Sequence, residues 1–211
     1  MFGVTGLHFN QLQLSGQRNN WLPRVRYLIW AFHWTAGHIL GGMIVGGVSG
    51  WVGSKISAGP GFYGLILLAL ICVVCALHQF QIINFPLPQL RRQVSRFWMQ
   101  KLHWNIVALG YGVQLGSGIA TRIKVATTYV FIGCAFLSGT FYMGAVIGAG
   151  FGLARAILPV IIGPRVSSPE ASFSFALNFN HYEKHVRNIN GALLLLSALF
   201  LITLFWLPQS G

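Results

Sequence analysis

The residues best suited to chemistry in this chain are cysteines and histidines that lie inside long apolar runs. Cys72, Cys75 and His78 are spaced three residues apart. On a helix they share one side, because each residue turns the chain by about 100°. Two thiols beside an imidazole could exchange electrons or hold a soft metal ion. Cys72 and Cys75 are therefore redox candidates, and the alternative is that they only pack as small apolar groups.

Histidines form a second set of candidates, because an ionisable residue inside a membrane helix indicates function by default. If the first two apolar runs cross a membrane in opposite directions, His33 and His78 lie at matched depth, about two turns from one face. Two opposed imidazoles could ligate a haem iron. His38 lies deeper, beside a pair of glycines. We take all three as candidate haem or pigment ligands; the alternative is neutral imidazoles bonded to backbone carbonyls.

Two further groups of polar residues lie outside the apolar runs. Arg122 and Lys124 flank an expected turn, where fixed positive charge could bind an anion or simply set the topology. His181, Glu183 and His185 form an H-x-E-x-H pattern, which differs from the H-E-x-x-H spacing of zinc proteases. This pattern is typical of a solvated helix start, and no metal is assigned to it.

Conventional enzyme chemistry is not indicated by the sequence. Glu170 and Glu183 are the only carboxylates among 211 residues, and neither lies in an apolar run. Carboxylate-based coupling to protons or cations is therefore not expected. The sequence also lacks paired acids, a nucleophile beside a base, and a glycine-rich loop with lysine for phosphate. The sequence does not specify a cofactor, and haem is the candidate that the histidines suggest.

Composition indicates that these residues are carried by helices in a lipid bilayer. The chain is 55% hydrophobic and 8% charged, whereas soluble domains average about 25% charged residues. Its 14 lysines and arginines outnumber the 2 acids and cluster between apolar runs. That clustering follows the positive-inside rule. We therefore expect a plasma (inner) membrane protein with the bilayer and other membrane subunits as partners, and not a nucleic-acid-binding protein.

The apolar runs and the loop charges together predict the topology. A spanning helix needs about 20 apolar residues. We expect one all-α polytopic domain over residues 1–211, with a polar N-terminal segment (1–22) and a polar loop (163–188). The expected spans are 27–52, 61–85, 125–137, 142–162 and 189–207.

Residues 103–120 are ambiguous. Loop charges fit best if this segment is broken or re-entrant, beside five full spans and a cytoplasmic N-terminus; six simple spans are the alternative.

Small residues recur at helical spacing in two of these runs. Stripes of this kind let helix backbones approach closely in lipid. They predict packing faces, either within the bundle or against a partner subunit. The stripes comprise Gly42, Gly46 and Gly50 in the first run, and Gly144, Gly148 and Gly152 in a later run.

A family resemblance rests on residues 110–163, which have a glycine-rich start, a small-residue turn and a glycine-striped helix containing the sequence FGLA. This stretch resembles the second broken helix and following helix of CcdA/DsbD-type transmembrane thiol–disulfide electron carriers, in the LysE-like transporter superfamily. Residues 24–53 resemble another helix of that family. The resemblance implies a divergent electron carrier or small transporter, although the family's cysteine is absent at Ala120–Thr121. The alternatives are a non-catalytic structural or assembly subunit and a haem- or pigment-contacting protein.

Overall fold

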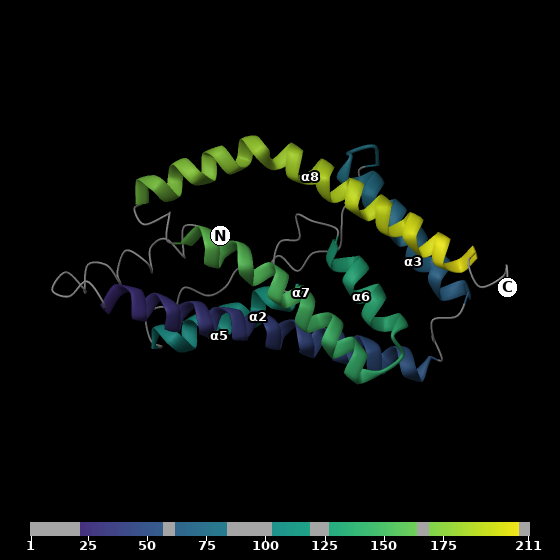
Figure 1. Cartoon of the computed structure of the whole chain (residues 1–211), viewed down its shortest axis with the longest axis horizontal. Coiled ribbons are helices and arrows are strands. Elements are labelled where there is room, and N and C mark those ends of the chain that lie inside the picture. The colour runs from purple at the N-terminus through teal and green to yellow at the C-terminus, as the bar shows by residue number, and fades with distance from the viewer. Residues whose placement is uncertain (1–21, 57–61, 84–102, 119–126, 164–168, 207–211) are drawn as a thin grey trace.

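The computed structural model describes residues 22–56, 62–83, 103–118, 127–163 and 169–206. All regular structure in these ranges is helical, which confirms the predicted all-α class. Figure 1 shows the helices as an elongated assembly, with α2 running along most of its length. The helices are α2 (Leu22–Lys55), α3 (Phe62–Gln79), α5 (Trp104–Gly116), α6 (Thr127–Leu137), α7 (Phe141–Ile162) and α8 (Pro169–Trp206).

Three of the helices are long and apolar enough to cross a membrane: Val25–Lys55, Phe141–Ile162 and Lys184–Thr203. The expectation of five full spans is not established, because the other apolar helices are shorter. At about 1.5 Å per residue, α6 covers about 16 Å, roughly half of a hydrocarbon core of about 30 Å. A full span at residues 125–137 is therefore not established, and only 127–137 of that run belongs to the described residues.

The centre of the fold is the antiparallel crossing of α2 and α7. Gly42 faces Gly148, and Gly46 faces Gly144, with backbone against backbone at both positions. A β-carbon on any of these glycines would overlap a carbonyl oxygen of the opposite helix. The two glycine stripes singled out in the sequence therefore lie against each other, and the contact depends on backbone proximity rather than on interlocking side chains.

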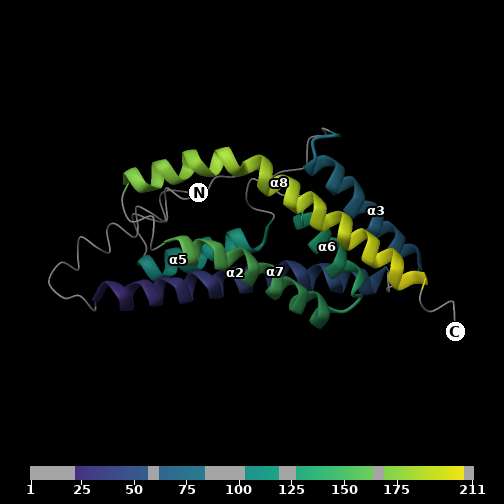
Figure 2. The ribbon, with the colours of Figure 1, turned by 45° about the horizontal axis from the view of Figure 1, so that its top comes forward.

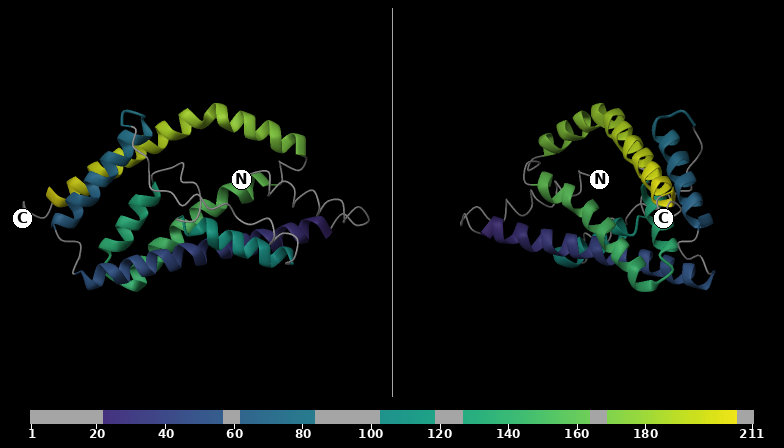
Figure 3. Two further views of the ribbon diagram at one scale, coloured as in Figure 1. Left: turned by 180° about the vertical axis from the view of Figure 1, so that it is seen from behind. Right: turned by 45° about the vertical axis from the view of Figure 1, so that its right-hand side comes forward.

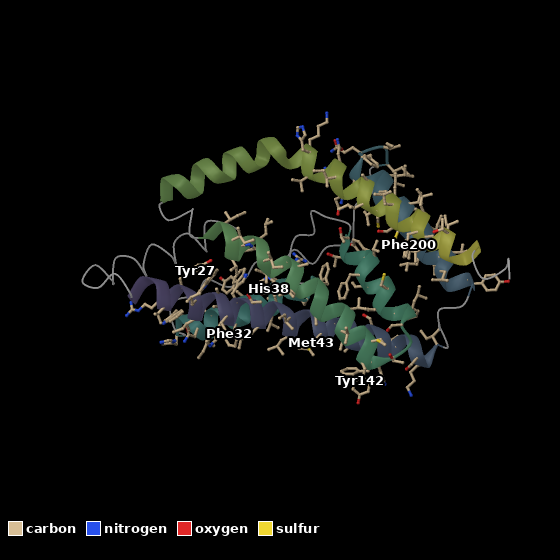
Figure 4. All side chains as sticks on the ribbon, viewed as in Figure 1. Tyr27, Phe32, His38, Met43, Tyr142 and Phe200 are labelled. Carbon is tan, nitrogen blue, oxygen red and sulfur yellow. The ribbon has the colours of Figure 1, made fainter. Side chains whose placement is uncertain are left out.

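A ladder of aromatic rings lines the first half of α2. Tyr27 stacks on Trp30, Trp30 on Trp34, and Trp34 on His38, with ring centroids 5.7, 5.2 and 4.7 Å apart. The Tyr27 hydroxyl donates a hydrogen bond to the carbonyl of Val160 on α7. Figure 4 shows Tyr27 and His38 on this part of α2. The ladder packs against α5 in a core of Trp30, Ala31, Trp34, Val107, Ala108, Tyr111, Leu115 and Ala156.

A second group of helices, α3 and α8, lies against α6 (Figure 3). Cys75 and Ala76 on α3 pack with Leu194 on α8 in a smaller apolar cluster, and side chains of α6 border it. The two helices are antiparallel, since Ala76 lies beside Leu194 while the carbonyl of His78 meets Arg187. Through these contacts α6 joins α3 and α8 to the α2–α7 pair.

The connections differ from the sequence prediction in one place. As expected, a tight turn joins the apolar helices α6 and α7: Gly139 has a φ of 61°, and the Thr140 hydroxyl caps α7 by accepting from the Met143 amide. Residues 169–188, however, belong to α8 and not to a polar loop. Pro169 suits the first position of a helix because that position needs no amide donor. Polarity alone does not distinguish a solvated helix from a loop.

Candidate functional site at the break between α5 and α6

Helices α5 and α6 lie along successive halves of α2 and run in the same direction as α2 (Figure 2). In α5, Gly112 lies against Gly37 of α2. In α6, the carbonyl of Phe136 lies against Gly53, near the other end of α2. The two short helices are therefore the halves of one discontinuous helix. The prediction that residues 103–120 form a broken or re-entrant segment, separate from the next run, stays a prediction.

The two halves meet at Gly118 and Thr128. Gly118 has a φ of +70°, which ends the helical path of α5. A β-carbon there would lie 2.8 Å from Thr128 Cγ2 and 3.4 Å from both Arg155 Nη1 and Phe151 Cε1. Helix ends expose backbone amides and carbonyls that have no partner within the helix. Breaks of this kind are where membrane proteins commonly bind ions and polar ligands.

Arg155 of α7 brings a positive charge to this break. Its guanidinium carbon lies 5.5 Å from the centroid of the Phe151 ring, within the range of a cation–π contact. Phe151 in turn stacks on Phe131 of α6, with centroids 4.3 Å apart and planes at 8°. Arg155 is half-buried although it lies within an apolar helix. Arg155 was not among the site residues predicted from the sequence, although an arginine within an apolar run was the available signal.

His38 lies at the same level of the bundle. Its side chain is 1% exposed, and its Nδ1 lies 2.9 Å from the Trp34 carbonyl oxygen. Its backbone packs directly against Gly116 of α5 and Gly152 of α7. No larger residue fits at either glycine, so three helices hold this imidazole in place beside the break. His38, the break and Arg155 together form the candidate site.

The other two histidine candidates lie elsewhere and are not brought together. His33 is on the half of α2 that packs with α5, with Nδ1 2.7 Å from the Ile29 carbonyl oxygen. His78 lies where α3 packs on α8, with Nδ1 3.2 Å from the Ile83 carbonyl oxygen. The described residues contain no group of three or more histidine, cysteine or acidic side chains placed to hold a metal. For His33 and His78 the sequence also left open the alternative of imidazoles bonded to backbone carbonyls, and each imidazole lies close to such a carbonyl.

The cysteine candidates are buried on α3, and the apolar cluster that contains Cys75 packs against Tyr129 and Val130 near the start of α6. Cys72 is 0% exposed and Cys75 is 5% exposed, and both are free thiols. Cys75 packs with Ala76 and Leu194 in the apolar cluster between α3 and α8. Their redox role stays a prediction. The anion-binding candidates Arg122 and Lys124 lie outside the described residues.

These features define an all-helical protein with membrane-length helices and a discontinuous helix at its centre. No protein-family model and no solved structure matches the chain. It is similar to methylamine utilization protein MauF of Methylophilus methylotrophus, with 31% identity over 132 residues, 62% of the chain and 46% of the relative. It is also similar to MauF of Paracoccus versutus, with 33% identity over 146 residues, 68% of the chain and 50% of the relative.

The chain spans about half the length of the curated relatives it matches. These relatives correct the family resemblance drawn from the sequence: they are MauF proteins, and the assignment to CcdA/DsbD-type carriers is wrong. That assignment rested on glycine spacing and turns. Close helix packing requires the same spacing in many membrane proteins, so the pattern does not identify one family.

Proposed function

We propose that this chain is a multi-span membrane component of a methylamine-utilization system and acts there as a non-catalytic structural or assembly subunit. The observation that carries the proposal is the similarity to MauF proteins of three bacteria, each named for methylamine utilization. The glycine-packed pair α2–α7 supports a structural role, because its contacts form a rigid scaffold of closely packed backbones.

The proposal includes a topology in which α2, α3, the discontinuous helix α5–α6, α7 and α8 each cross the plasma (inner) membrane once. The direction alternates, since α7 is antiparallel to both α2 and α6 and α3 is antiparallel to α8. With the N-terminus in the cytoplasm, Lys55 is the one described basic residue at the outer ends. That distribution agrees with the positive-inside rule.

Deleting the gene for this chain from the bacterium that carries it tests the proposal. The deletion strain should fail to grow with methylamine as the nitrogen source and should grow normally with ammonium. A plasmid copy should restore growth. Normal growth of the deletion strain on methylamine, or a parent strain that cannot use methylamine, would overturn the proposed function.

A further inference from the structure

A polar cluster lies at the end of the α3–α8 contact, one helical turn beyond the apolar cluster of Cys75, Ala76 and Leu194. Gln79 follows Cys75 by four residues, and Asn190 precedes Leu194 by four, so each shares the face of its apolar neighbour. Because α3 and α8 are antiparallel, both polar side chains extend toward the same end. The polar cluster comprises Gln79, Thr127, Arg187 and Asn190.

Two hydrogen bonds fix where the polar groups of this cluster lie. Arg187 donates from Nη2 to the backbone carbonyl of His78, the residue before Gln79, at 3.2 Å. Asn190, one turn further along α8, accepts through Oδ1 from the Thr127 hydroxyl at 2.7 Å. The end of α3, the start of α6 and the beginning of the apolar part of α8 therefore meet here.

Four atoms of the cluster are buried without a hydrogen-bond partner. They are both polar atoms of the Gln79 carboxamide, Nε of Arg187 and Nδ2 of Asn190. Gln79 is 1% exposed. An unpaired buried polar group costs about 1–3 kcal/mol, and more when charged, so four at one place indicate a missing partner. Gln79 was not a sequence candidate, because a glutamine at the end of an apolar run looks like an ordinary helix end.

The chemistry of the four atoms selects the partner. Gln79 Nε2, Arg187 Nε and Asn190 Nδ2 are donors, while Gln79 Oε1 is an acceptor. Three donors, one of them on a guanidinium, suit an oxyanion and disfavour a cation. The remaining acceptor suits a ligand that also carries a hydroxyl or ammonium donor. The chain's two carboxylates, Glu170 and Glu183, are both on α8.

We propose that the polar cluster is a binding site for a phosphate group that also carries a hydrogen-bond donor, as phospholipid headgroups and free phosphate do. Arg187 lies within the first turn of the apolar part of α8, which begins at Lys184. Headgroups lie at this level of a bilayer, and basic sites between helices bind them. This inference is independent of the role in methylamine utilization.

Thermal unfolding of the delipidated full-length protein in mild detergent tests the site. Phosphatidylglycerol should raise the Tm, because a ligand that binds only the folded state stabilises it. Diacylglycerol with the same acyl chains should not, since it lacks the phosphate. Sodium phosphate distinguishes the two sources: a rise with phosphatidylglycerol alone assigns a lipid headgroup, and an equal rise with sodium phosphate assigns the free anion.

Matched variants link the response to the cluster. Arg187→Gln should weaken phosphatidylglycerol binding at least about tenfold, because it removes a charged donor. Lys184→Gln removes an exposed positive charge one turn away on α8 and should leave binding unchanged. Gln79→Leu replaces the two unpaired atoms with apolar groups. It should raise the Tm of the ligand-free protein and reduce the response to phosphatidylglycerol.

The proposal fails if phosphatidylglycerol and diacylglycerol shift the Tm equally, because only acyl-chain binding would then be present. It also fails if neither phosphatidylglycerol nor phosphate shifts the Tm, which would leave water alone on the four atoms. If Arg187→Gln does not fold, Gln79→Leu decides the matter. A Gln79→Leu protein with the full response to phosphatidylglycerol would overturn the site.

Discussion

Gly42 and Gly148 face each other where α2 crosses α7, so closely that a β-carbon on either residue would overlap the carbonyl oxygen of the other. The same α7 segment carries Gly150, whose missing β-carbon would meet nothing within 4 Å. Two glycines in one helix turn thus have opposite environments. The contact between α2 and α7 therefore lies within the chain, and the stripe on this part of α7 is occupied by α2.

We expect Gly148→Leu to destabilise the protein and Gly150→Leu to be tolerated. The leucine at position 148 would push α2 away from α7, and overpacking of this kind costs at least about 1–3 kcal/mol. The measurement is the yield of monodisperse protein in detergent together with its Tm. A Gly148→Leu protein as stable as the Gly150→Leu control would contradict the crossing described here.

Impermeant thiol reagents in intact cells test the proposed topology. Ser54→Cys, exposed near the outer end of α2, should be labelled. A cysteine placed at Ser210 should be labelled, whereas a cysteine placed at Ser95 should be protected from the reagent. Reversed labelling at Ser95 and Ser210 would reject the cytoplasmic N-terminus. The native Cys72 and Cys75 are buried and should contribute little background.

The buried thiols allow a direct test of the redox prediction. The double change Cys72→Ala and Cys75→Ala should cost only about 1 kcal/mol per site, because little volume is lost. We expect growth on methylamine to be unchanged, since both thiols are buried and Cys75 packs in an apolar cluster. Lost growth with an unchanged Tm would instead show that the thiols take part in function.

Arg155 provides a test of the break between α5 and α6. Arg155→Leu should lower growth on methylamine while folded protein is retained, because the helix is apolar and accepts leucine. Arg155→Lys keeps the charge near Phe151 and should restore part of the growth. For both variants, the amount of folded protein in the membrane is measured beside growth, so that a loss of function can be separated from a loss of folded protein. Full growth of the Arg155→Leu strain would show that Arg155 at the break is not needed for growth on methylamine.

Several features of the fold could be predicted from the sequence, because they follow from strong local signals. Apolar runs predicted the helical class, and the small-residue turn at 138–140 lies between α6 and α7 as expected. The interruption of the helix at Gly118 could not be located so well. A glycine-rich apolar stretch is compatible with a continuous helix, a broken helix or a re-entrant segment, and only its packing against α2 decides among them.

The candidate site was less accessible to sequence reasoning, because it depends on which helices are neighbours. His38 was selected for its position in an apolar run, but its place beside Gly116 and Gly152 requires the fold. His33 and His78 have matched depth in sequence terms, yet they belong to different helix contacts. Charge counts indicate on which side of the membrane a helix end lies, but they do not indicate which helix packs beside it.

The discontinuity at Gly118 and Thr128 also has a mechanical consequence. An unbroken helix is a stiff rod, since each turn is tied to the next by hydrogen bonds. The α5–α6 element is interrupted instead, whereas α2 and α7 are continuous helices that pass beside the interruption. Arg155 belongs to α7 and lies directly beside the interruption at Gly118. Among the described residues, α5 and α6 are coupled through their shared contacts with α2 and α7, so a displacement of α6 by α3 and α8 also acts on those two helices.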